Sequence, residues 1–201
     1  VSQEKMAENM LYVLKGNSDK YDCTAEIKAF SEKSFKLPLN SSVKILSNNK
    51  TIVVIIPHVY QPIPLFIVFR ALGIISDKEI LKFILYDLDN EMSNRFLNFL
   101  VPTIKHSKAI STQQLAFEYI LKFTRWQNRH HVLNILRKEF LAQIDELFLY
   151  KAYYLGYMVN RLLHVNEGFD EPTDKDSYVN KRIELSGSLM SELFRELYLE
   201  F

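Results

Sequence analysis

The sequence has little of several things that particular classes of protein require. Cys23 is the single cysteine, which excludes an intramolecular disulfide and a cysteine-based zinc site and favours a reducing compartment. Only five glycines are present, and none has the spacing of a phosphate-binding loop. No apolar run approaches the roughly 18 residues that a membrane span needs, and the polar N-terminal segment is not typical of a signal peptide.

Net charge is also nearly absent, because 25 lysines and arginines stand against 24 aspartates and glutamates. This balance argues against a protein that binds nucleic acid through its net positive charge alone. What is present is a hydrophobic fraction of 48% in 201 residues, enough for one domain or one domain plus part of a second. An apolar rhythm of leucines, at positions 185, 189, 193 and 197, still continues where the chain stops. We therefore expect an excised piece of a longer polypeptide.

Residues 1–60 have the pattern of a small antiparallel sheet. Residues 10–14 form a short apolar run that ends at a turn cluster, Gly16-Asn17-Ser18-Asp19, and residues 24–30 alternate like a strand exposed on one face. Residues 43–46 and 51–56 flank Asn48-Asn49 and predict a hairpin.

From residue 61 onward the pattern is helical. Gln61-Pro62-Ile63-Pro64 suits a helix entry, so that residues 64–72 run as a helix up to Gly73. Two capping boxes, at 76–79 and 111–114, predict further helices, and the others cover residues 92–100, 132–147, 149–163 and 185–201. A sheet followed by about six helices, without βαβ alternation, predicts an α+β fold.

Catalytic and metal-binding patterns are weak. His130 and His131 are adjacent and would point about 100° apart on a helix, so they cannot share a metal face. The acidic run 87–91 lacks the glycine and the glutamate of a calcium loop. Cys23 lies in an expected strand with no histidine near it in sequence. We therefore predict no catalytic residue and no metal ligand in this chain.

A basic cluster surrounds Trp126, the single tryptophan. Lys122, Arg125, Arg129 and the two histidines give this region a composition that can bind single-stranded nucleic acid by stacking and charge. A solvated loop between helices explains the same residues, and the sequence favours that interpretation.

Three ordered segments resemble one protein family, the second-largest subunit of multisubunit DNA-directed RNA polymerases of the eukaryotic, archaeal and large-DNA-virus type. Residues 174–187 read Asp-Lys-Asp-Ser-Tyr-Val-Asn-Lys-Arg-Ile-Glu-Leu-Ser-Gly and are similar to the family's Asp-x-Asp-His-Tyr-x-Asn-Lys-Arg signature. Residues 62–74, which contain Phe-Arg-Ala-Leu-Gly, and residues 151–163, which contain Ala-Tyr-Tyr-Leu-Gly-Tyr-Met, match two further stretches of the family.

This resemblance implies the lobe of that subunit, a cleft wall near downstream DNA and the non-template strand that also offers a surface to initiation factors. It implies 1–60 as the end of the protrusion and the start of the lobe, 61–187 as the helical lobe, and 188–201 as a helix returning toward the protrusion. The implied partners are the other polymerase subunits, especially the largest. The catalytic magnesium of the assembled nucleotidyltransferase would lie elsewhere, so no cofactor is expected here. The nucleus would be the location, or the host cell or virion for a viral source.

The resemblance also implies contacts with DNA from Asp176, Asn180, Lys181 and Arg182. A carboxylate can accept a hydrogen bond from a base amino group, and the basic pair would hold phosphates. The sequence departs from the family at Lys175 and Ser177, where arginine and histidine are usual. A purely structural role remains open, in which Arg182 pairs with Glu184 or a helix end. A free-standing α+β interaction module without enzymatic role is the competing function.

Overall fold

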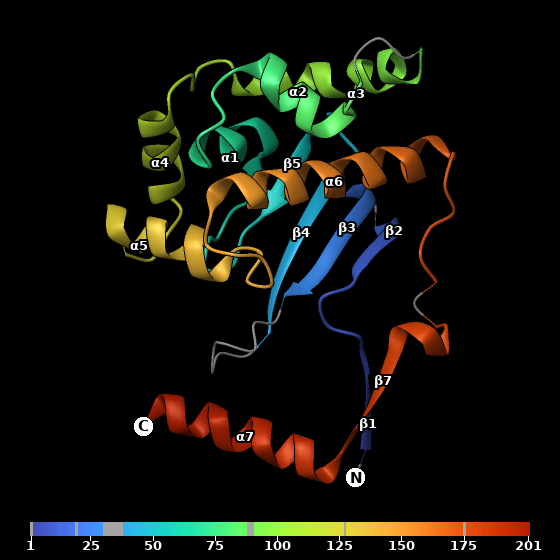
Figure 1. Ribbon diagram of the computed structural model, residues 1–201, viewed down its shortest axis with the longest axis vertical. Helices are drawn as coiled ribbons and strands as arrows, with labels where there is room; N and C mark the ends of the chain where they lie inside the picture. Colours follow the sequence, from blue (N-terminus) through green and yellow to red (C-terminus); the bar gives the residue numbers. More distant parts are fainter. Residues whose placement is uncertain (1, 19, 30–37, 88–90, 127, 175) are drawn as a thin grey trace.

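The computed structural model describes residues 2–18, 20–29, 38–87, 91–126, 128–174 and 176–201. Within this part of the chain, helices cover one face of a five-stranded antiparallel sheet, and a two-stranded sheet carries a further helix away from this main body (Figure 1). Strands come first and helices follow in the main body. The predicted α+β fold is confirmed.

The main sheet has the strand order β2-β3-β4-β5-β6. Its strands are β2 (Leu11–Ser18), β3 (Tyr21–Ala29), β4 (Leu39–Leu46), β5 (Ile52–Ile55) and β6 (Ile63–Pro64). The predicted hairpin is confirmed, with Ile45 opposite Ile52. Along β3, Cys23, Ala25 and Ile27 are buried while the residues between them are partly exposed, because successive side chains point to opposite faces.

One prediction about the strands was wrong. The turn cluster at Gly16 does not end the first strand, because β2 continues to Ser18. Gly16 permits this course, since a Cβ atom there would lie only 1.7 Å from the carbonyl oxygen of Tyr21. The predicted helix entry is confirmed, because Pro64 is the N-cap of the helix that begins at Leu65. Ile63–Pro64 also forms the short strand β6 and pairs with β5, which was not predicted.

Seven α-helices occur in the described residues, close to the number expected. They are α1 (Leu65–Ala71), α2 (Asp77–Leu85), α3 (Glu91–Ser107), α4 (Gln113–Leu121), α5 (Arg129–Asn134), α6 (Phe148–Glu167) and α7 (Ser186–Glu200). Ser76 occupies the N-cap of α2, and the Thr112 hydroxyl caps α4 by accepting from Leu115 N at 3.4 Å. Both predicted capping boxes therefore mark real helix starts.

Two helix boundaries were predicted wrongly. Pro102 does not end a helix but lies inside α3, which continues to Ser107. The amphipathic stretch 132–147 is not one helix, since α5 stops at Asn134 and a π-helical turn, Ile135–Glu139, follows it. Amphipathic spacing reports burial on one face, and it does not locate the residue where backbone hydrogen bonding changes.

The segment 62–74 owes its pattern to the core. Leu65, Phe66 and Phe69 of α1 have no measurable exposure, and the guanidinium of Arg70 is buried among them. Arg70 donates to Ser107 O at 2.7 Å, to Ile110 O, and to Asp77 Oδ1 at 2.5 Å. The arginine thus joins the ends of α3 and α1 to the start of α2.

The segment 151–163 lies in α6, which crosses the sheet over β2, β3 and β4 (Figure 1). Gly156 allows α2 to approach closely, because a Cβ there would lie 2.3 Å from Phe83 O. Asn160 Nδ2 donates to Ile84 O at 2.8 Å. These contacts explain why a small residue and an amide stand on this face of the helix.

Lys151, at the start of the same motif, is fully buried. Its Nζ donates to Arg137 O at 2.7 Å and Phe140 O at 2.5 Å, where the π-helical turn leaves carbonyls without helical partners. Burial lowers the pKa of the Lys151 ammonium to about 8, and the nearby Glu146 charge opposes this shift.

Lys151 gives the protein a pH-dependent stability. Above pH 8 the folded chain releases a proton that the unfolded chain holds until about pH 10.5, so the free energy of unfolding rises with pH, by at most about 1.4 kcal/mol per unit. We expect the free energy of unfolding of the natural chain, measured with urea, to rise relative to that of a Lys151→Met variant as the pH increases above 8. Burial also raises the pKa of Cys23, to about 11, which lowers the free energy of unfolding as the pH rises. This effect is the same in the natural chain and the variant, so it cancels in the comparison. A constant difference would contradict the assignment.

The second sheet was not predicted. β1 (Ser2–Met6) pairs antiparallel with β7 (Lys181–Leu185), with Met6 opposite Lys181, and α7 follows directly. We call β1, β7 and α7 the stalk; it projects from the main body in Figure 1. Lys5 Nζ ties the stalk together, because it lies 3.2 Å from Glu8, 3.3 Å from Glu192 and also pairs with Glu184.

Candidate nucleic-acid interface

The predicted contact residues lie on the segment that leads from α6 back to the stalk. Gly168 ends α6 in a left-handed conformation, φ 79°, which glycine adopts without strain. The chain then runs beside the edge strand β2, where Thr173 N donates to Val13 O at 2.7 Å and Val13 N donates to Thr173 Oγ1 at 3.1 Å. These two bonds fix the approach of the segment to the sheet.

Asp174 organises the loop that follows. Its carboxylate accepts from Asp176 N at 2.9 Å, and its backbone oxygen accepts from Asn180 Nδ2 at 2.7 Å. The Asn180 side chain therefore closes the loop from within. Lys175, where the sequence departs from the family, lies outside the described residues, whereas Ser177 N-caps the short 3-10 turn Tyr178–Asn180.

Two charged side chains of this loop lie close together, and a third follows them along the chain. Asp176 is 92% exposed, and its Oδ1 lies 3.7 Å from Lys181 Nζ. Arg182 is also exposed and donates to Val179 O at 3.0 Å and Lys181 O at 2.8 Å. We call Asp176, Lys181 and Arg182 the loop charges.

The structural alternative for Arg182 is therefore answered in part. Glu184 pairs with Lys5, and Arg182 donates to backbone oxygens at the end of the 3-10 turn. An exposed guanidinium has five donor hydrogens, so these two bonds leave donors for a phosphate. Contact of the four predicted residues with DNA stays a prediction.

The junction between main body and stalk is rigidly bonded. Tyr12, only 2% exposed, donates its hydroxyl proton to Ala7 O at 3.0 Å and lies 3.3 Å from Asn180 O. Ala7 N donates to Asn180 O at 2.9 Å. Burial raises the pKa of the Tyr12 hydroxyl, which keeps it protonated and able to donate. The two places where the chain passes between main body and stalk, near Ala7 and near Asn180, are thus hydrogen-bonded to each other beside the loop charges.

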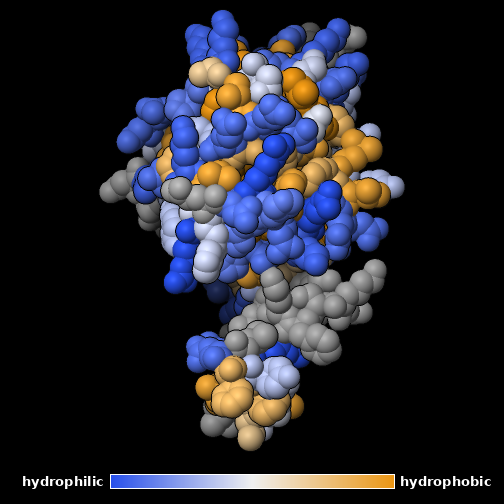
Figure 2. Space-filling view, turned by 90° about the vertical axis from the view of Figure 1, so that its left-hand side faces the viewer, coloured by the Kyte–Doolittle hydropathy of each residue, from blue (hydrophilic) through white to orange (hydrophobic). Residues whose placement is uncertain are grey.

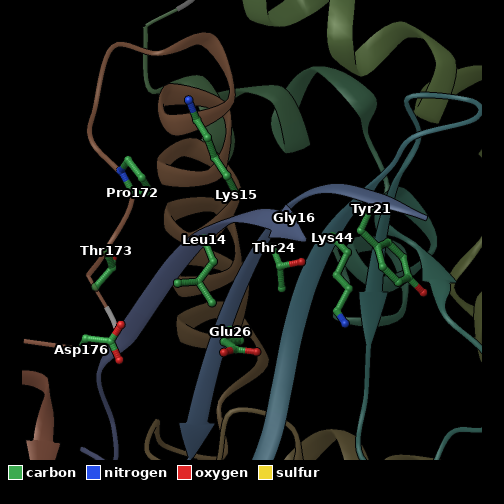
Figure 3. A pocket seen from close by; sticks show the side chains of 10 residues that line it. All are labelled: Leu14, Lys15, Gly16, Tyr21, Thr24, Glu26, Lys44, Pro172, Thr173 and Asp176. Carbon is green, nitrogen blue, oxygen red and sulfur yellow. The ribbon is translucent and has the colours of Figure 1, made fainter. Parts of the chain in front are cut away.

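A polar pocket of about 560 Å³ adjoins the loop charges (Figure 3). The open face of β2, β3 and β4 forms its floor, and Pro172, Thr173 and Asp176 form one wall. Its ammonium groups are those of Lys15 and Lys44, and Lys44 Nζ lies 4.7 Å from the centre of the Tyr21 ring. The lining residues are Leu14, Lys15, Gly16, Tyr21, Thr24, Glu26, Lys44, Pro172, Thr173 and Asp176. Asp176 thus belongs to both the pocket and the loop charges.

No metal site emerges from the side chains that the structure describes. Within them, no group of three or more histidine, cysteine, aspartate or glutamate side chains could hold a metal ion, so the residues present do not fit the magnesium of a polymerase. Residues 88–90 of the acidic run lie outside the described part. Cys23 is buried, and its raised pKa keeps the thiol protonated. None of the described helices is long and apolar enough to cross a membrane.

Comparison with known proteins gives consistent matches. The family model for RNA polymerase Rpb2, domain 2, matches residues 7–184. The chain is 39% identical to the DNA-directed RNA polymerase II subunit RPB2 of Encephalitozoon cuniculi, over 98% of this chain and 18% of that protein. It is 34% identical to the DNA-directed RNA polymerase II subunit 2 of Arabidopsis thaliana, over 98% and 18%, and 31% identical to the archaeal subunit Rpo2 of Saccharolobus solfataricus, over 100% and 18%.

The chain spans about a fifth of the length of these relatives. The family match covers the main body, the loop charges and all but the last residue of β7. It includes segments 62–74 and 151–163 in full and segment 174–187 as far as residue 184. The chain belongs to the RNA polymerase Rpb2 domain 2 family and corresponds to a fragment of a second-largest RNA polymerase subunit.

Proposed function

We propose that this chain forms the lobe of a DNA-directed RNA polymerase, a cleft wall on which the loop charges face downstream DNA and the non-template strand. One observation carries this proposal, namely that Asp176 and Lys181 lie 3.7 Å apart at the junction of main body and stalk and that the exposed Arg182 follows them directly. Lys181 and Arg182 would hold phosphates, and Asp176 would accept a hydrogen bond from a base. Asn180 would act by shaping the loop.

The polymerase reaction itself belongs, in this proposal, to the assembled enzyme. This chain would contribute surfaces that contact DNA and other proteins, and the largest subunit would contribute most of the magnesium ligands. Initiation factors would dock on the outer helices. The nucleus is the proposed location, or the host cell or virion if the source is viral.

The stalk supports an attachment to further parts of the polymerase. Its exposed apolar side chains follow one another on β7 and α7, and they include Ile183, Leu185, Met190, Leu193, Phe194, Leu197 and Tyr198. Figure 2 shows hydrophobic residues on this lower part of the molecule. We propose that this face packs against the protrusion and that residues 61–187 form the helical lobe. Contiguous apolar surface of this kind is typical of an interface.

Replacing both Lys181 and Arg182 by alanine should leave the fold intact and weaken downstream DNA binding by the assembled polymerase. Each lost phosphate contact removes about 0.9 from the slope of log K against log salt, so the slope should fall by about 2. Binding to a downstream duplex, titrated against salt, measures this effect.

A matched control is the pair Lys105→Ala and Lys108→Ala, which removes the same charge near the end of α3, and it should leave the slope unchanged. If the Lys181/Arg182 variant instead unfolds at a much lower temperature, the pair is structural. Co-purification of the full-length protein tests the proposal more broadly, because a free-standing interaction module would not bring a largest polymerase subunit with it.

A further inference from the structure

Two aromatic side chains from distant parts of the sequence are presented to solvent on one side of the main body. Tyr60 is 72% exposed and Trp126 is 64% exposed. Tyr60 N donates to Phe123 O at 3.0 Å, and the preceding residue forms an isolated antiparallel bridge with Thr124. Backbone bonding therefore holds the two segments side by side.

Hydrogen bonds from Thr124 and Asn128 hold the backbone at Trp126. Thr124, only 6% exposed, donates its hydroxyl proton to Leu121 O at 2.9 Å and lies 3.2 Å from Trp126 O. Asn128 N donates to the same Trp126 oxygen at 2.7 Å. Because the backbone is held on both sides, the indole is displayed outward instead of packing into the core that lies beneath it.

Basic side chains flank the indole. Lys122, Arg125 and Arg129 are all exposed. The Arg129 guanidinium lies 5.7 Å from the centre of the Phe117 ring, a cation–π contact that orients it. The carboxylate of Glu118 precedes Lys122 by one helical turn. We call Tyr60, Lys122, Arg125, Trp126 and Arg129 the Trp126 surface.

The Trp126 surface is separate from the loop charges. It joins the end of α4 to the start of α5, on the opposite side of the main body from residues 170–174 and 176–182 in Figure 1. Figure 2 looks onto that side and shows it to be mainly hydrophilic, with scattered hydrophobic residues. A solvated loop would explain the charges alone, but it would not explain two displayed aromatic rings on a fixed backbone.

We propose that the Trp126 surface binds single-stranded nucleic acid, in addition to the duplex contact proposed for the loop charges. Bases would stack on Trp126 and Tyr60, and Lys122, Arg125 and Arg129 would hold the phosphates between them. An unpaired strand fits better than a duplex, since only unpaired bases offer a free face to an exposed ring. Three cations beside the aromatic rings also complement a polyanion.

The single tryptophan makes the proposal directly measurable. Titrating the chain with an oligo-dT of about 12 nucleotides, within the site sizes of single-strand binders, should quench the fluorescence of Trp126. Binding should be weak, with a Kd on the order of 10⁻⁵ M, and should weaken further with salt. The Arg125→Ala and Arg129→Ala double variant should reduce the salt slope by about 1.4, because each phosphate on a single strand contributes about 0.7.

Aromatic variants separate stacking from charge. Trp126→Ala should bind labelled oligo-dT at least about fivefold more weakly, the lower end of what one stacked base contributes, whereas Trp126→Phe should retain most of the affinity. Phe194→Ala, an exposed aromatic change on α7, and the Lys105/Lys108 double variant should leave quenching unchanged. Unchanged affinity of Trp126→Ala would overturn the proposal. So would equal quenching by a duplex of the same length, or tighter binding of an oligo-glutamate peptide, which would indicate an acidic protein segment as the occupant.

Discussion

Replacing Arg70 by methionine is expected to lower the free energy of unfolding by about 3–5 kcal/mol, the range found when one partner of a buried charged network is removed. The guanidinium is 4% exposed and donates to two backbone oxygens, of Ser107 and Ile110, as well as to Asp77. Without it, buried carbonyl groups lose their partners, each at a cost of about 1–3 kcal/mol. Urea unfolding of the chain measures the change.

Asp77→Asn is the matched control for Arg70. The Asp77 side chain is 44% exposed, so water replaces most of what its carboxylate loses, and a surface ion pair contributes about 0–1 kcal/mol. We therefore expect a change below about 1 kcal/mol for this variant. Equal losses for the two variants would mean that the ion pair, and not the carbonyl contacts, is what Arg70 provides.

Adding one methyl group at Gly156 is expected to destabilise the chain by about 1–3 kcal/mol, the usual cost of overpacking a core. The new Cβ would lie 2.3 Å from Phe83 O and 2.8 Å from Phe83 C. Both are backbone atoms of α2, so the whole helix must shift. The shift would also lengthen the bond from Asn160 to Ile84 O. Thermal and urea unfolding of Gly156→Ala test this directly.

Gly187→Ala is the matched control, because it makes the same substitution in a helix where no neighbouring atom is close. Gly187 also lies in a helix, α7, but a Cβ there would meet nothing within 4 Å. Alanine is a better helix former than glycine by up to about 1 kcal/mol, so this variant should be neutral or slightly stabilised. If Gly156→Ala behaved like Gly187→Ala, α2 and α6 would not pack as closely as the structure shows.

Sequence patterns predicted the elements that depend on nearby residues. The hairpin of β4 and β5 follows from two β-branched runs around a short turn, and the alternating residues of β3 match its buried and exposed faces. Helix α6 extends only a few residues beyond the predicted stretch 149–163. In each case the hydrophobic period has one structural solution, because the apolar positions must all face the same core.

Elements that depend on distant residues escaped prediction. β1 carries no alternating apolar pattern and becomes a strand because β7, at the other end of the chain, pairs with it. Ile63–Pro64 becomes a strand in the same way, through β5. Pro102 was expected to break a helix, but α3 continues through it.

The candidate site shows the same division. The signature segment 174–187 was visible in the sequence, and two of its charged residues, Asp176 and Lys181, lie 3.7 Å apart in the structure. Asn180 has an internal hydrogen-bond partner that the pattern could not reveal. The placement of Tyr60 beside Trp126 also had no sequence signal, because two backbone contacts between distant segments produce it.

By itself, the sequence determined the fold class and the polymerase resemblance, which the family match then confirmed, because periodicity and ordered motifs are properties of residues along the chain. Only the tertiary structure decided which conserved-looking residues serve the fold. Arg70, Gly156 and Lys151 resemble functional motif residues in the sequence, yet each is buried against backbone oxygens. The physical reason is that the partners of a buried polar group come from other elements, and only folding brings those elements within hydrogen-bonding distance.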